Sequence, residues 1–107
     1  MIAQPTDIDL PTGADREEVD DWQVNPDGSR YRHVWSSPAE LRDGISELDI
    51  RCVVTQYEDG TIAADGEDAP EIYVGDSSYA PSDAFFIASA IIQATTQAFQ
   101  WVSSGAK

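Results

Sequence analysis

The chain has 107 residues, of which 41% are hydrophobic and 24% charged, and its formal net charge at pH 7 is −14. This length provides one domain, whose core is feasible without disulfides or metal. The single cysteine, Cys52, excludes an intramolecular disulfide and a cysteine-built zinc site, and a reducing cytoplasm is the expected compartment. The first residues also lack the basic and apolar regions of a signal peptide.

The charge has consequences for partners. A surface at −14 repels phosphates and anionic lipid head groups, so we expect neither direct nucleic-acid binding nor membrane association. Two interpretations remain, which are solubility in a crowded cytosol and imitation of a polyanion. Beyond Arg51 no basic residue occurs before Lys107, which leaves the acidic residues of that half without local partners.

The chain divides into three parts. Residues 1–21 combine Pro5, Pro11 and Gly13 with many carboxylates, a composition that predicts a mobile acidic arm. Residues 22–103 are expected to form a single α+β domain, and residues 104–107 a C-terminal tail.

The domain begins with a predicted hairpin. Strands at 22–24 and 29–35 flank Asn25-Pro26-Asp27-Gly28, whose proline and Asp-Gly pair are typical of a turn. Ser37-Pro38-Ala39-Glu40 then has the capping-box arrangement, which predicts a short helical turn near 38–43 that ends at Gly44.

Alternation of apolar and polar residues predicts the next strands. From Leu48 to Tyr57 one side carries Leu48, Ile50, Cys52 and Val54, so Cys52 is expected in the core. A turn at 58–61 returns the chain through 62–64, and 71–75 alternates again. Short links between consecutive strands predict an antiparallel sheet of four or five strands.

A long C-terminal helix is predicted from Pro81 to about Ser103. Its apolar residues share one stripe, which we expect to pack on one face of the sheet: Ala84, Ile87, Ala88, Ile91, Thr95, Ala98, Phe99 and Val102. We reject a membrane span, because three glutamines and two threonines interrupt the segment and anchors are missing on both sides.

The apolar arc of this helix is wider than one sheet requires. Ala90, Ala94 and Ala98 form a ridge of small side chains beside Trp101, and Phe86 projects into the polar side. We therefore predict a homodimer, with Phe86, Ala90, Ala94 and Trp101 as the candidate interface.

The familiar catalytic and metal motifs are absent from the sequence. His33 is the sole histidine and no serine or cysteine nucleophile signature accompanies it, so we expect it on the sheet surface. Neither Asp27-Gly28 nor Asp65-Gly66 fits a calcium-binding loop, and no glycine-rich phosphate loop occurs. We expect no catalytic residue, metal or cofactor, with an unrecognised enzyme as the third hypothesis.

Aromatic residues gather in the first hairpin. Trp22, Tyr31 and Trp35 interleave with Arg30 and Arg32, a combination found in single-strand nucleic-acid platforms. Two arginines stand against a net charge of −14, so packing or a protein contact explains the same residues better.

The order of parts, from Tyr31-Arg32-His33-Val34-Trp35 through Gln56-Tyr57-Glu58-Asp59-Gly60-Thr61 and Pro70-Glu71-Ile72-Tyr73-Val74 to the closing helix, resembles small uncharacterised proteins of actinobacteria and their phages. The resemblance covers about residues 22–103. Some similar proteins carry cysteine and histidine pairs near the first hairpin, where this chain has only His33. The resemblance transfers no catalytic residue.

Together these features predict a small non-enzymatic cytosolic interaction protein of actinobacterial or phage origin that forms a homodimer and binds a protein partner. The alternative is an acidic inhibitor that imitates DNA or another polyanion to occupy a basic site on a host protein. Its candidate acidic contact surface is Glu58, Asp59, Glu67, Asp68 and Glu71.

Overall fold

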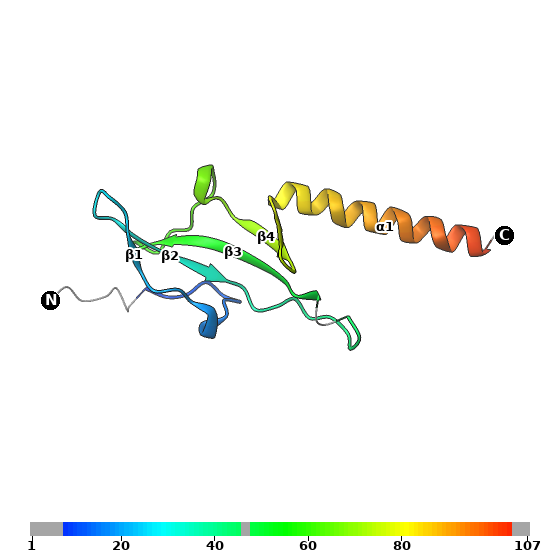
Figure 1. Ribbon diagram of the computed structural model, residues 1–107, viewed down its shortest axis with the longest axis horizontal. Coiled ribbons are helices and arrows are strands. Elements are labelled where there is room, and N and C mark those ends of the chain that lie inside the picture. The colour runs from blue at the N-terminus through cyan, green and yellow to red at the C-terminus, as the bar shows by residue number, and fades with distance from the viewer. Residues whose placement is uncertain (1–7, 46–47, 104–107) are drawn as a thin grey trace.

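The computed structural model describes residues 8–45 and 48–103, which form an open sheet and a long helix (Figure 1). The elements in chain order are η1 (Arg16–Glu18), β1 (Gln23–Val24), β2 (Arg30–Trp35), β3 (Ile50–Tyr57), η3 (Gly66–Asp68), β4 (Glu71–Val74), β5 (Ser77–Tyr79) and α1 (Pro81–Ser103). The strands lie in the order β1-β2-β3-β4-β5 and every neighbouring pair is antiparallel. The predicted α+β class is confirmed.

The strand register separates two faces of the sheet. Val34 lies opposite Val54, Cys52 opposite Ile72, and Ile50 opposite Val74. Because side chains alternate along a strand, these residues share one face, which we call the apolar face. The other face carries residues of the opposite parity, among them Trp35, Val53 and Tyr73.

Turn chemistry fixes two turns as predicted, one in the first hairpin and one after β3. In the first, the Asn25 amide donates to the Ser29 carbonyl at 2.8 Å, and Asp27 Oδ1 accepts from the Ser29 amide. In the second, the Tyr57 amide donates to the Thr61 carbonyl, and Gly60 has a φ of 90°. A positive φ of this size favours glycine.

The fifth strand differs from the one expected. Residues 62–64 make only an isolated bridge between Ile62 and Gln56, together with a bond from the Ala63 amide to the Thr55 carbonyl. The fifth strand is instead β5, which follows β4 after a tight turn at Gly75 and Asp76. With a φ of 61°, Gly75 supplies the positive φ of that turn.

The prediction of a helical turn near 38–43 is wrong. The Ala39 amide donates to the Ile50 carbonyl at 2.8 Å, which holds this segment extended beside the start of β3. The chain turns later, at 43–45, where the Ile45 amide donates to the Arg42 carbonyl. The competing bond across to β3 outweighs the local capping pattern.

The prediction of a mobile acidic arm is also wrong for residues 8–21, because these residues lie against the sheet. The Asp15 amide donates to the Trp35 carbonyl at 2.8 Å, and Ala14 makes a bridge with Ser36. The Ile8 carbonyl accepts a hydrogen bond from Arg32 of β2, and the Asp9 carbonyl accepts one from Gln56 of β3. Residues 1–7 and the expected tail at 104–107 lie outside the described residues.

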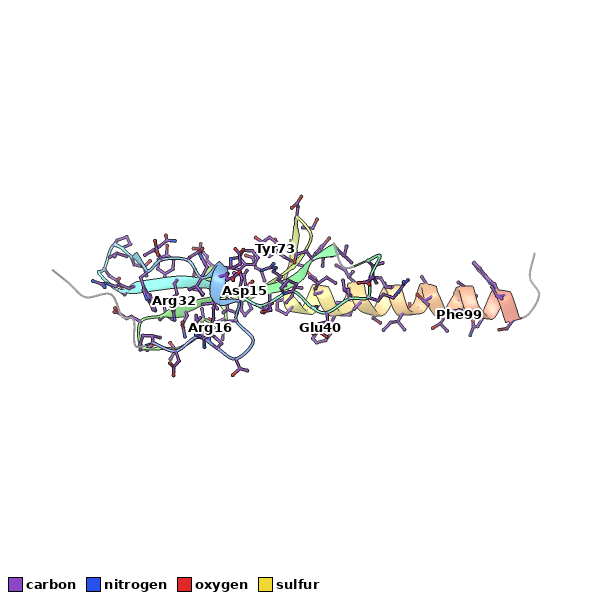
Figure 2. All side chains as sticks on the ribbon, turned by 90° about the horizontal axis from the view of Figure 1, so that it is seen from below. Asp15, Arg16, Arg32, Glu40, Tyr73 and Phe99 are labelled. Atoms are coloured by element: carbon purple, nitrogen blue, oxygen red, sulfur yellow. The ribbon has the colours of Figure 1, made fainter. Side chains whose placement is uncertain are left out.

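The long helix begins at Pro81 as predicted, but it does not pack on a face of the sheet. Its contacts are with β4 and β5, and none of its residues is buried. From there α1 projects away from the sheet, as the yellow-to-red ribbon of Figure 1 and the side view of Figure 2 show. One residue, Ala80, joins β5 to α1, so the helix begins directly at this edge of the sheet.

This arrangement leaves little core. Among the described residues, the buried apolar side chains are Val34 and Ala63, and the buried polar ones are Arg32, Thr55 and Gln56. The accessible surface is 8202 Å². A compact monomer of 11.7 kDa would expose only about 5,900 Å². The protein therefore exposes much more surface than its mass requires.

Candidate functional site

Among the described residues, helix α1 carries the most exposed apolar surface. Of twelve large hydrophobic residues exposed in the described part of the chain, eight lie on this helix: Phe85, Phe86, Ile87, Ile91, Ile92, Phe99, Trp101 and Val102. Scattered exposed apolar residues are ordinary, whereas a contiguous group marks an interaction surface. Residues 84–103 also contain no charged side chain, in a chain of net charge −14.

An apolar groove lies where α1 leaves the sheet. Its volume is about 440 Å³, and it separates the start of the helix from the apolar face of the sheet. The sheet side is formed by Leu48, Ile50, Ile72, Val74 and Tyr79, and the helix side by Pro81, Ala84, Phe85, Ile87, Ala88 and Ile91. The groove therefore uses only the first half of the stripe predicted to cover the sheet.

The second half of the stripe lies past the end of the groove. Thr95, Ala98 and Val102 follow Ile91 at the spacing that keeps residues on one side of a helix. They are all exposed, and Val102 has 77% of its surface accessible. One apolar stripe thus begins in the groove and continues for about 16.5 Å beyond Ile91, to Val102.

The predicted interface residues are all exposed on α1. Phe86 is 74% and Trp101 60% accessible, and Ala90 and Ala94 are exposed as well. None of the four lines the groove. At 100° per residue Ala90, Ala94 and Trp101 occupy the flank of the helix beside the stripe, whereas Phe86 lies on the polar side. Sequence reasoning singled out this exposed helix but did not find the groove, because the groove depends on the direction in which α1 leaves the sheet.

The predicted acidic surface is divided between two neighbouring segments. Glu58 and Asp59 lie in the turn after β3, and Glu67 and Asp68 in η3, with Glu71 at the start of β4. The Tyr57 hydroxyl donates to Asp68 Oδ2 at 3.1 Å, which brings the two segments together. Desolvation of the Tyr57 hydroxyl is the main cause that raises the pKa of Tyr57, and the hydrogen bond to Asp68 raises it further.

Two carboxylates have local structural roles. Asp59 accepts bonds from the hydroxyl and the amide of Thr61, and these bonds lower the pKa of Asp59. Asp27 does the same with Ser29 in the first hairpin, and its pKa is lowered in the same way. Asp59 therefore stabilises its turn, whatever else it contacts.

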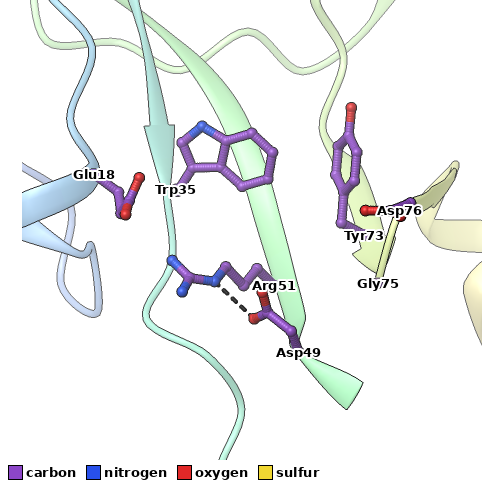
Figure 3. Close-up of a pocket in the computed structure, with 7 residues that line it drawn as sticks. All are labelled: Glu18, Trp35, Asp49, Arg51, Tyr73, Gly75 and Asp76. Atoms are coloured by element: carbon purple, nitrogen blue, oxygen red, sulfur yellow. Dashed lines mark hydrogen bonds and ion pairs between the residues drawn. The ribbon is translucent and has the colours of Figure 1, made fainter. Parts of the chain in front are cut away.

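A second hollow lies on the other face of the sheet (Figure 3). Its volume is about 360 Å³, and its aromatic wall is the pair Trp35 and Tyr73, whose ring centroids lie 4.9 Å apart. The Arg51 guanidinium binds Asp49 at 2.8 Å and Asp15 at 3.2 Å. The hydrogen bond to Asp49 is the main cause that raises the pKa of Arg51. Arg51 is thus already paired and has its role in anchoring Asp15 to β3.

Arg32 is the second anchor, a role that sequence reasoning did not specify when it assigned the aromatic and basic residues of the first hairpin to packing or a protein contact. Its side chain is buried, donates from Nε to Gln56 Oε1 at 2.9 Å, and donates from Nη2 to the Ile8 carbonyl at 3.0 Å. The guanidinium also lies 4.4 Å from the centre of the Trp22 ring. Desolvation lowers the pKa of Arg32.

His33 lies on the sheet surface, as predicted, with 42% of its side chain accessible. Its Nδ1 is 3.4 Å from Asp20 Oδ2, and its ring meets the edge of Tyr31. In the described part of the chain, no cluster of three or more histidine, cysteine or acidic residues is arranged to hold a metal. Within those same residues, no helix combines the length and apolar character needed to cross a membrane.

Comparisons with protein-family profiles, with curated proteins and with solved structures found no match for this chain.

Proposed function

We propose that this protein is a non-enzymatic interaction protein that works as a homodimer, with α1 as the element that joins the two copies. The observation that supports this proposal is the exposure of α1, whose apolar side chains face solvent along the whole helix. With only Val34 and Ala63 buried among the described apolar residues, a single copy has a small hydrophobic contribution to its stability. Association of two copies buries the apolar side chains of α1 that a single copy exposes.

The exposed area is large enough for a stable dimer. A standard interface buries about 800 Å² on each partner. The surface of 8202 Å² exceeds the value of about 5,900 Å² for a compact monomer by about 2,300 Å². This excess belongs to the whole chain, and the eight exposed large apolar residues of α1 are a contiguous part of it that a second copy can cover.

The charge distribution favours a second copy at this helix. Two molecules of charge −14 repel each other, and association requires that the contact exclude the acidic surface. Residues 84–103 carry no charge, so two α1 helices meet without desolvating a carboxylate. The free cysteine, Cys52, fits a reducing cytoplasm, which we propose as the compartment.

Sedimentation velocity tests this proposal. The wild type should sediment as a dimer at micromolar concentration, and Ile91→Asp should sediment as a monomer, because a carboxylate in the apolar stripe loses its water on association. A central apolar contact is worth on the order of 2 kcal/mol or more, about 30-fold in Kd. The matched control is Gln93→Asp, which puts the same charge on the polar side of α1 and should remain dimeric. A monomeric wild type would refute the proposal.

The second candidate is the acidic polyanion mimic, and the contact between Tyr57 and Asp68 favours it by joining the two acidic segments. Such a complex with a basic protein weakens steeply with salt, as charge-driven complexes do. Glu67→Gln with Glu71→Gln should weaken it, whereas Glu17→Gln with Glu18→Gln, on the far segment η1, should not. Equal losses from both pairs would oppose a specific acidic surface.

A further inference from the structure

The apolar stripe of α1 has a heptad arrangement that defines how two copies meet. Ala84, Ile91 and Ala98 are seven residues apart, and so are Ala88, Thr95 and Val102. The two sets alternate at spacings of four and three residues, which is the a and d pattern of a coiled coil. The first half of this pattern lines the groove, and the second half extends past it.

We propose that the C-terminal half of α1 from a second copy lies in the groove, antiparallel to α1 of the first. This inference rests on the proposed homodimer and specifies its geometry. An isologous two-fold contact is reciprocal, so the first copy's C-terminal half fills the second copy's groove by the same operation. Both the open groove and the exposed half of the stripe are then covered.

The register follows from the heptad positions. An antiparallel pair centred on residue 93 places Ala84 opposite Val102, Ala88 opposite Ala98, and Ile91 opposite Thr95. Every layer then joins an a position to a d position, so the two seams match along their length. Small alanine and threonine side chains let the helix axes approach to about 8 Å, the close end of the usual range. In this arrangement the second helix lies along α1 and faces Ile50, Ile72 and Val74, which line the sheet side of the open groove.

The charge pattern supports this occupant over others. The groove walls are apolar, and a partner bearing basic groups would find no carboxylate among the residues that line the groove. The C-terminal half of α1 offers the matching chemistry, because Thr95, Ala98, Phe99 and Val102 are all uncharged. Residues 84–103 also belong to the longest uncharged stretch of this acidic chain, so this helix approaches another copy with little charge repulsion.

Disulfide trapping tests the register. In a Cys52→Ala background, Ala84→Cys protein is mixed with Val102→Cys protein under mild oxidation. The mixture should give a covalent heterodimer, because the two positions face each other. Neither variant should crosslink alone, since residues 84 and 102 of one helix are about 27 Å apart and a disulfide needs Cα atoms within about 7 Å. The matched control, Gln100→Cys on the polar side of α1, should not crosslink to Ala84→Cys.

A charge exchange provides a second test that uses no cysteine. Ala88→Glu and Ala98→Lys should each be more monomeric than wild type by sedimentation, and their equimolar mixture should recover the dimer, because each Glu then meets a Lys. If the two helices were parallel, Val102→Cys protein would crosslink to itself and the equimolar mixture would not recover the dimer. That result would overturn the antiparallel register but not the dimer. A monomeric wild type would overturn the proposed function as well, leaving the groove for a different partner.

Discussion

Replacing Arg32 by alanine should be among the most destabilising single changes in this protein. The side chain is 8% accessible, donates to Gln56 Oε1 and the Ile8 carbonyl, and stacks on Trp22. Each hydrogen bond from a charged donor is worth about 1.5–3 kcal/mol, and the cation–π contact adds about 1 kcal/mol. Since these contributions are not additive, we expect a loss of about 3–5 kcal/mol, a large fraction of the stability of a small domain.

Urea unfolding followed by circular dichroism measures this loss, with wild type and variant at the same protein concentration so that association affects both equally. The matched control is Arg42→Ala, whose exposed side chain makes one long bond to the Asp43 carbonyl and should cost less than about 0.5 kcal/mol. In a Trp22→Leu background the cost of Arg32→Ala should shrink by about 1 kcal/mol. A loss below about 1 kcal/mol in the parent protein would refute the anchoring role of Arg32.

Three further predictions concern the turns and the histidine. Gly60→Ala should destabilise the protein by about 1 kcal/mol in thermal unfolding, because φ is 90° and no atom lies within 4 Å of an added Cβ, so the cost is backbone strain alone; an unchanged melting temperature would contradict this. The lowered pKa values of Asp27 and Asp59 mean that their contribution is complete above about pH 4 and lost as the pH falls below it, so the pH profile of stability should flatten on the acid side when both are replaced by Asn. His33→Gln should fold and retain any biological phenotype, with stability changed by less than about 1 kcal/mol, since its pairing with Asp20 is exposed; loss of phenotype in a folded variant would favour a catalytic role.

The sequence predicted the sheet and the limits of the helix because those depend on local patterns. Alternation from Leu48 to Tyr57 required a strand with Ile50, Cys52 and Val54 on one side, and β3 places them opposite apolar partners of β2 and β4. A proline at the first helical position and a 3.6-residue period defined α1. The α+β class followed from these two patterns.

The errors arise where a distant contact decides the local structure. At 37–40 the hydrogen bond from the Ala39 amide to the Ile50 carbonyl replaces the helical turn that the capping pattern predicts. The acidic segment 8–21 is held by Arg32 and Arg51, and the apolar periodicity of the sequence does not indicate their partners. The direction in which α1 leaves β5 is a tertiary feature that the helical period of the sequence does not determine. Because the groove exists only through that direction, the sequence indicated an apolar helix surface without locating its site.

Amide hydrogen exchange along α1 tests most directly the claim that a second copy covers this helix. Residues 92–103 extend beyond the groove, and an isolated helical segment of this length frays in water. Their amides should be protected at protein concentrations where the mass is dimeric, and should exchange rapidly in Ile91→Asp or on dilution to the monomer. Rapid exchange in a sample whose mass is dimeric, or equal protection in a monomer, would contradict the account.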